Sequence, residues 1–442
     1  MVNVAKIYSI LGNPNSLIPL AIKDTASTTG MTVGSFITGK EEGHDRFIDE
    51  VGTEIIWLGG IPFFKWLYDK TVFKALNLDS KFDARNLKDE KLLSKISEYA
   101  PTEDVKQGVD KIIKNSKTFK NAAAAKFFVS TALTVGSYIG LTKFKQKFTE
   151  NKIRKNLIAE YEAEKKAKEE AKKENNIEKN NATSFKGLGS AIESLAFSPV
   201  KNMWVLDGCI TAERLKDSRT KQEFIGYAIK EASILTFMYY AGGKIQSILE
   251  KNATKKHGKS ISLDARVLED EAFKKAFEDG SIEKSLIEFK KVGKESSDLY
   301  EFLHKNPNNM IVKTAKKSDV IQMYKEPQGL FKKAKVTDKI DTRKFVDLEE
   351  FKGIAEKIEE LYGQYKEALK KGEVSDKFFE GVKRLKRKSI ITNIGSCILA
   401  LGVVTPAIML AKRFIGNDDT EFETKKRIRE QLIKEGVIAW KN

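Results

Sequence analysis

Residues 389–411, SIITNIGSCILALGVVTPAIMLA, form the strongest local signal in the chain, because they include no charged side chain. About 20 consecutive apolar residues suffice for a helix to cross the hydrocarbon core of a bilayer. Basic residues stand on both sides of the segment: Lys383, Arg384, Lys386, Arg387 and Lys388 before it, and Lys412 and Arg413 after it. Such flanks are expected where a helix is held between two headgroup layers, and their excess before the segment predicts that this side is cytoplasmic. We therefore expect a membrane-spanning helix; the alternative is a buried central helix of a soluble α-helical domain.

A second apolar segment, residues 122–141, reads AAAAKFFVSTALTVGSYIGL. Its one charge, Lys126, lies near an end of the segment, where a long side chain can reach the membrane interface. Ala132, Gly136 and Gly140 recur at every fourth position, so a helix places these small residues on one face. We expect a second spanning helix whose small-residue face packs closely against a neighbour. A soluble helical bundle can use small residues in the same way.

Two further apolar segments are shorter, residues 51–64 (VGTEIIWLGGIPFF) and residues 232–243 (ASILTFMYYAGG). Their Gly-Gly pairs, their aromatic residues and the proline of the first segment favour bent, re-entrant or interfacial helices. Charges in or beside apolar segments are costly unless they are paired or reach water. The candidate intramembrane charges are Glu54, Glu231, Lys126 and Lys244. We expect the two glutamates to form structural ion pairs, with Lys126 or Lys244 as partners; a transport site is the alternative.

The chain contains an apparent internal duplication. Residues 83–90 (DARNLKDE) and residues 264–271 (DARVLEDE) agree at six of eight positions. Upstream, Glu54 and Glu231 occupy matching places at the two short apolar segments. The charged residues of the repeated DAR motif are Asp83, Arg85, Asp264 and Arg266. We expect them to cap helices and bind backbone carbonyl groups rather than to catalyse a reaction.

The order of these features predicts two repeat units and three other segments. They are residues 1–142 for the first unit, 143–186 for a charged linker helix, 187–416 for the second unit, about 275–375 for a helical subdomain inserted into the second unit, and 417–442 for a C-terminal amphipathic helix. The linker is rich in lysine and glutamate and has few apolar residues, so we expect it to be solvated.

The charge balance indicates the kind of partner. The chain of 442 residues carries 79 Lys and Arg against 62 Asp and Glu, a formal net charge of +17, which favours an anionic surface. Lys111, Lys114, Lys117 and Lys120 form a basic stripe just before residues 122–141. Attraction to headgroups explains both the stripe and the apolar segment, whereas nucleic-acid binding leaves the apolar segment unexplained. We expect an anionic phospholipid membrane as partner and no nucleic acid.

Sequence motifs of catalysis are absent. Two cysteines, Cys209 and Cys397, make no disulfide framework, and the three histidines have no ligand-like spacing. Residues 242–244 (GGK) are not a Walker motif, because position 238, where that motif needs a glycine, is methionine. We expect no catalytic residues, no cofactor and no metal site, and therefore no enzyme.

The sequence thus predicts a mainly α-helical, two-repeat membrane protein with two strong and two weak apolar segments and charged helices outside the bilayer. The expected function is a membrane-anchored scaffold that binds anionic lipid surfaces, as a single chain or a homo-oligomer. The composition is compatible with an AT-rich bacterial genome, so we expect the bacterial inner membrane. One alternative is a small carrier or channel built from the repeats. The other is a soluble all-α interaction protein.

Overall fold

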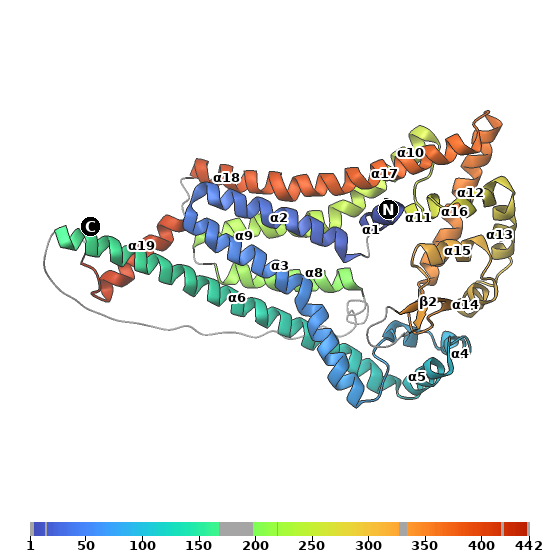
Figure 1. Ribbon diagram of the computed structural model, residues 1–442, viewed down its shortest axis with the longest axis horizontal. Coiled ribbons are helices and arrows are strands. Elements are labelled where there is room, and N and C mark those ends of the chain that lie inside the picture. Colours follow the sequence, from blue (N-terminus) through green and yellow to red (C-terminus); the bar gives the residue numbers. More distant parts are fainter. Residues whose placement is uncertain are drawn as a thin grey trace.

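The computed structural model is mainly α-helical, as predicted, and has two parts: a long helical bundle and a helical head at one end of it (Figure 1). The structure describes residues 4–13, 16–167, 198–218, 220–326, 334–416 and 420–439. The chain crosses between the two parts several times, so head and bundle are each built from distant stretches of sequence.

The bundle consists of long helices that run beside one another. They are α1 (Val4–Gly12), α2 (Leu17–Thr38), α3 (Lys40–Tyr68), η1 (Asp69–Phe73), α6 (Ser116–Ala167), α8 (Pro199–Lys216), α9 (Lys221–Ile234), η3 (Leu235–Ala241), α10 (Gly242–His257), α17 (Ser375–Leu399), η4 (Ala400–Val404), α18 (Thr405–Gly416) and α19 (Thr420–Lys434). Ser16, Ser198 and Thr220 set the starts of α2, α8 and α9, because their hydroxyls accept hydrogen bonds from first-turn amides. The segments η1, η3 and η4 are π-helical, a conformation often found at functional sites.

The head is a compact set of short helices with a β-hairpin. Its elements are η2 (Ala84–Lys88, a 3-10 helix), α4 (Glu90–Glu98), α5 (Glu103–Lys114), α11 (Ala265–Leu268), α12 (Glu271–Glu278), α13 (Ser281–Lys290), α14 (Ser296–Lys305), α15 (Met310–Lys317), β1 (Met323–Glu326), β2 (Lys335–Ile340) and α16 (Leu348–Lys370). The two strands pair antiparallel, with Met323 opposite Ile340. Aromatic packing centres on Phe277, whose ring contacts Tyr362 and Phe379 edge to face.

All four apolar segments lie in the bundle. Residues 51–64 fall within α3, 122–141 within α6, 232–243 run from α9 through η3 to the start of α10, and 389–411 run from α17 through η4 to α18. The shorter two are thus parts of long helices. Two helical stretches, Ser116–Glu162 and Ser375–Lys412, are long and apolar enough to cross a membrane, yet only 33% and 22% of their most apolar windows are buried. A core helix of a soluble protein would be mostly buried.

The other predicted segments fall in different places. Of the predicted linker, the part up to Ala167 continues helix α6, and residues 168–186 lie outside the described residues. The C-terminal helix α19 packs through Ile428 and Leu432 against Ile153 and Leu157 near the far end of α6. The predicted insertion contains α13 to α16 and the hairpin. The head also includes η2, α4 and α5, which the chain contributes between α3 and α6.

Helices α2 and η4 cross closely in the bundle. A Cβ on Gly30 would overlap the carbonyl oxygen of Gly402, and a Cβ on Gly402 would lie 2.9 Å from the carbonyl oxygen of Ala26. The predicted small-residue face of α6 is different: Ala132, Gly136 and Gly140 are exposed. A Cβ on either glycine of that face would meet no atom within 4 Å, so within the described part of the chain no helix packs closely against it.

Candidate functional site

The bundle has an inverted distribution of side chains. Large apolar residues are exposed along its helices, among them Ile22, Val33, Phe36, Ile55, Phe63, Phe128, Leu133, Phe148, Trp204, Ile391, Leu399, Val403 and Ile408. Polar residues are buried inside it, among them Lys23, Asp45, Asp49, Glu50, Lys145, Asn202, Asp207, Arg214, Lys230 and Glu231. The head has the ordinary arrangement, with an apolar core and charged surface pairs. Buried charges must be paired or hydrogen-bonded, so the interior of the bundle is the candidate functional site.

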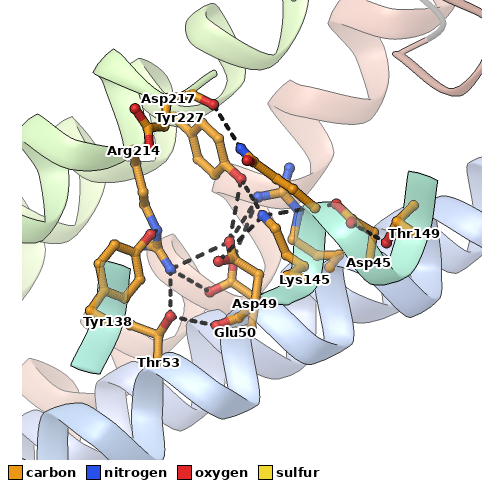
Figure 2. Close-up of polar contacts among 12 residues, drawn as sticks. Asp45, Asp49, Glu50, Thr53, Tyr138, Lys145, Thr149, Arg214, Asp217 and Tyr227 are labelled. Atoms are coloured by element: carbon orange, nitrogen blue, oxygen red, sulfur yellow. Dashed lines mark hydrogen bonds and ion pairs between the residues drawn. The ribbon is translucent and has the colours of Figure 1, made fainter. Parts of the chain in front are cut away.

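Eight buried charged residues meet where α3, α6, α8 and α9 come together, and we call them the ionic core. They are Asp45, Arg46, Asp49, Glu50, Lys145, Arg214, Lys230 and Glu231. Figure 2 labels five of them, Asp45, Asp49, Glu50, Lys145 and Arg214. Helical spacing on α3 explains how four of them come from one helix, since residues three and four apart share a face. The other four come from three helices: Lys145 from α6, Arg214 from α8, and Lys230 and Glu231 from α9.

Arg214 is the hub of the ionic core. Its guanidinium pairs with Glu231 of α9 and lies 3.5 Å from Asp49 of α3. The same group donates to the hydroxyls of Tyr138 at 2.9 Å and Thr53 at 3.1 Å, so it contacts α3, α6 and α9 from its place on α8. Figure 2 shows this side chain pointing from α8 toward the acids of α3. A planar fork of donors suits such multiple recognition.

Lys145 and Lys230 pair with different acids of the ionic core. Lys145 Nζ lies 3.5 Å from Asp49 and donates to the Tyr227 hydroxyl at 3.1 Å. Lys230 Nζ donates to Glu50 at 2.5 Å and lies 3.6 Å from Glu231. Four cations and four carboxylates therefore offset one another, as buried charges require.

Three further carboxylates, Asp24 of α2, Glu54 of α3 and Asp207 of α8, lie beside the ionic core, and we call them the carboxylate group. Glu54 accepts a hydrogen bond from Thr25, and Asp207 accepts one from Tyr239. Asp24 interacts electrostatically with Glu54 and with Lys230, Glu50 and Arg214 of the ionic core. Asp207 interacts electrostatically with Asp24. Among the described residues, no cation forms an ion pair with any of the three. The described interior therefore carries an excess of carboxylates.

The structure separates the four charges that the sequence singled out. Glu231 belongs to the ionic core, whereas Glu54 belongs to the carboxylate group. Neither pairs with the expected lysines. Lys126 pairs with Asp69 at 2.6 Å, and Lys244 is exposed, with its ammonium 5.5 Å from the ring centre of Tyr240.

The two DAR motifs have one geometry. Asp83 caps η2 and accepts from the Arg85 amide at 3.0 Å, while Arg85 Nη2 returns to the same carboxylate at 2.7 Å. Asp264 caps α11 and accepts from the Arg266 amide at 2.7 Å, with Arg266 Nη2 at 3.2 Å from it. Both motifs lie where the head meets the bundle.

A third Asp-x-Arg turn was not recognised from the sequence. The Asp341 carboxylate accepts from Arg343 Nε at 2.8 Å, and the Arg343 carbonyl accepts from the Asp83 amide at 2.8 Å. This turn follows β2 and joins the first DAR motif to the hairpin. Its middle residue is threonine, so a search for the exact tripeptide misses it, whereas the Asp-x-Arg spacing would have found it.

A cavity of about 1040 Å³ lies between the bundle and the head. Both DAR aspartates line it, as do Lys23 and Tyr239 from the bundle. On the head side, burial lowers the pKa of Lys344 and raises the pKa of Glu350. Among the described residues, no group of three or more His, Cys, Asp or Glu is arranged to hold a metal ion.

Sequence reasoning missed the ionic core almost entirely. Only Glu231 was selected, because it borders an apolar segment. Arg214 and Lys145 lie outside the apolar segments, and nothing local in their sequence distinguishes them from surface residues. Comparison with protein-family models, with characterised proteins and with solved structures found no match to the chain.

Proposed function

We propose that this chain is a membrane-embedded carrier whose bundle couples movement of a solute to movement of protons or small cations. The observation that carries the proposal is the inverted bundle with its carboxylate group, for which the described residues supply no cation partner. The bundle would lie in the bilayer, which we expect to be the inner membrane of a bacterium, and the head would lie in the adjoining aqueous phase.

The exposed apolar surface supports membrane embedding. Soluble proteins rarely expose large continuous apolar surfaces, whereas a bilayer solvates them. The low burial of the two longest apolar helices argues against the soluble alternative, because an apolar helix in a soluble core should be covered. The exposed Lys111, Lys114 and Lys117 beside α6 fit contact with anionic headgroups.

The charged interior supports transport. Ionisable residues inside a membrane are costly, and they commonly mark pathways for ions, protons or substrates. The ionic core balances its own charges, but the carboxylate group does not, so it calls for protons or cations as partners. Tyr239 links Asp207 to the cavity, and Asp24 links Asp207 electrostatically to the ionic core. Polar side chains are therefore present from the cavity wall at Tyr239 to the ionic core.

The internal duplication is part of this proposal. Both copies of the DAR motif follow a pair of bundle helices and precede a short head helix that begins at the next acidic pair. The later long helix of each half then returns through the bundle. Carriers are often built from such repeats, with their sites at the interface between the two.

A structural scaffold is the second candidate. The balanced ionic core favours it, because a cluster whose charges offset one another can serve only to hold the helices together. On this reading Glu54 and Asp207 would only hold helices together through their hydrogen bonds to Thr25 and Tyr239, and the bundle would anchor the head to an anionic lipid surface.

Reconstitution of the purified chain into vesicles tests the proposal. The vesicles hold a pH-sensitive dye, and entry of protons and of radioactive Na⁺ is measured after an inside-negative potential is imposed, with and without inorganic phosphate outside. We expect entry above that of empty vesicles. Asp207→Asn should abolish it, because asparagine keeps the size and the Tyr239 hydrogen bond but removes the ionisable group.

The matched control is Asp104→Asn, an exposed aspartate of α5 in the head that does not line the cavity, and it should leave entry unchanged. Thermal unfolding of each variant shows whether a loss of entry reflects a loss of folding. Entry no faster than in empty vesicles under every condition would favour the scaffold.

A further inference from the structure

The cavity between the bundle and the head is large enough to hold a small molecule. With about 1040 Å³ it reaches the upper end of the range for sites of small molecules. Bundle and head each supply part of its wall, so a bound molecule would contact both parts at once. Binding in the cavity would therefore involve side chains of the head as well as of the bundle.

The lining is biased toward positive charge. Nine lysine or arginine side chains line the cavity, against six aspartates or glutamates. Four of the carboxylates are already engaged in ion pairs with arginine or lysine, namely Asp83, Glu250, Asp264 and Asp319. Arg85, Lys126 and Lys386 of the wall are also in ion pairs, so the positive bias of the cavity rests on other lysines, among them Lys23, Lys81, Lys344 and Lys357.

Lys23 is the clearest of these lysines. It is only 6% exposed, and its Nζ donates to the carbonyl oxygens of Phe237 and Met238 in the π-helical segment η3 at 3.3 and 3.4 Å. A Cβ on Gly242 would come within 2.9 Å of this Nζ, so the glycine leaves room for the ammonium. Among the described residues no carboxylate forms an ion pair with Lys23, so an anion in the cavity would supply a direct counter-charge.

Two long helices also point their N-termini into the cavity. Ser16 and Ser198 are the N-caps of α2 and α8, and both line it. A helix N-terminus carries partial positive charge, and these caps are neutral, so they do not offset it. Helix N-termini combined with lysines are a recurring arrangement for phosphate recognition.

We propose that this cavity binds an anion that carries a phosphate group. The inference deepens the proposed function, on which it rests for the claim that the anion is the carried solute. A phosphate group of this kind comes either from a soluble phosphorylated molecule or from the headgroup of an anionic lipid that enters from the bilayer. Tyr239 and Lys23 place the bound anion at the mouth of the carboxylate group, where its charge is coupled to the occupancy of the acids.

Binding is measured on the purified full chain in uncharged detergent. One arm titrates inorganic phosphate against chloride at equal ionic strength and follows heat release. The second arm adds phosphatidylglycerol or, for comparison, zwitterionic phosphatidylcholine to the micelles. Saturable binding of phosphate identifies a soluble anion, and saturable binding of phosphatidylglycerol alone identifies a lipid headgroup.

Two substitutions on opposite walls test the location. Lys344→Gln on the head side and Lys23→Gln on the bundle side should each weaken binding about tenfold, through loss of one charge-assisted contact. Lys284→Gln, an exposed lysine of α13 outside the cavity, is the matched control and should leave binding unchanged. If Lys23→Gln fails to fold, Lys344→Gln still decides the location.

The results separate this inference from the proposed function. Saturable binding that Lys344→Gln weakens, together with no ion entry into vesicles, retains the site and removes the carrier. Ion entry without saturable binding in either arm removes the site and retains the carrier. Binding that neither substitution changes overturns the assignment of the cavity.

Discussion

At the scale of single residues, Arg214 concentrates the electrostatic organisation of the bundle. It is 4% exposed and contacts acids or hydroxyls of three other helices. A buried pair adds little net stability when both partners are present, but removal of one partner leaves an uncompensated charge. Removal of a buried arginine should therefore cost more stability than removal of an exposed one.

Arg214→Gln should therefore destabilise the protein strongly. We expect the free energy of unfolding to fall by about 3–5 kcal/mol, because Asp49 and Glu231 lose their shared cation. Arg427→Gln is the control, since its pair with Glu150 is 40% exposed on both sides and should contribute less than about 1 kcal/mol. Thermal unfolding in detergent compares the two. Equal losses would show that the ionic core is no more than a surface-like cluster.

His304 in the head should make the stability of the protein depend on pH. Its ring stacks on Tyr99 with 4.4 Å between ring centres, and burial, with a smaller contribution from the charge of Lys316, lowers its pKa to about 4. In the unfolded chain His304 has the ordinary histidine pKa of about 6.5. Between pH 6.5 and 4 the unfolded state therefore binds more protons than the folded state. Stability of the head should fall as the pH drops through this window, by at most about 3 kcal/mol.

Amide hydrogen exchange in α14 measures this effect, because exchange there requires the head to open. Protection should decrease from pH 6.5 to pH 4 after correction for the intrinsic exchange rate. His304→Gln should flatten the dependence. An unchanged slope in this variant would assign the pH dependence to other groups.

At the scale of elements, the crossing of α2 and η4 depends on glycine. Gly30→Ala should cost about 1–3 kcal/mol of stability, because the added methyl group meets the backbone carbonyl of Gly402, which cannot rotate away. Gly136→Ala on α6 has open space around it and should be neutral or stabilise by up to about 1 kcal/mol through helix propensity. Unfolding in detergent measures both changes.

The second variant also tests a homo-oligomer. If Gly136→Ala lowers stability and splits an oligomer in size-exclusion chromatography, the exposed face of Ala132, Gly136 and Gly140 contacts another copy of the chain. A neutral variant with unchanged elution leaves the crossing of α2 and η4 as the small-residue contact that matters.

The sequence made some elements easy to predict and hid others. Residues 389–411 and 122–141 stand out because they are almost free of charged side chains on their exposed as well as their buried faces. Helices α2 and α8 were missed, since Asp24 and Asp207 interrupt their apolar runs. In an inverted bundle the polar face is the buried face, so a charge in mid-helix signals the interior rather than a loop. The ionic core could not be predicted, because only the fold brings its residues together.

At the scale of the whole molecule, the basic residues before the last apolar segment have a second use. The sequence predicts that they contact lipid headgroups. In the structure, Lys386 donates to the carbonyl oxygen of Ile261 at 2.7 Å, and Arg387 pairs with Glu269. These contacts fasten α17 to the head. The positive charge that predicts orientation therefore also holds the two parts of the protein together.

The length of α6 sets the arrangement across the membrane. The helix has 52 residues, which at about 1.5 Å per residue far exceeds the thickness of a bilayer core. It begins beside the head and ends at the opposite end of the bundle, where α19 packs on it (Figure 1). If the bundle spans the membrane, the head and the far end of α6 must lie on opposite sides.

Single cysteines at Lys284 in α13 and Lys155 in α6, both exposed, test this arrangement in a background without Cys209 and Cys397. A membrane-impermeant maleimide should label Lys155→Cys in intact cells and Lys284→Cys only in inverted vesicles, because the basic excess before the last apolar segment predicts a cytoplasmic head. The reverse pattern would keep the spanning bundle and invert its orientation. Labelling of both positions from the same side would contradict a bundle that crosses the bilayer, and with it the carrier, because a polar route through the bundle transports nothing unless its two ends open on different compartments.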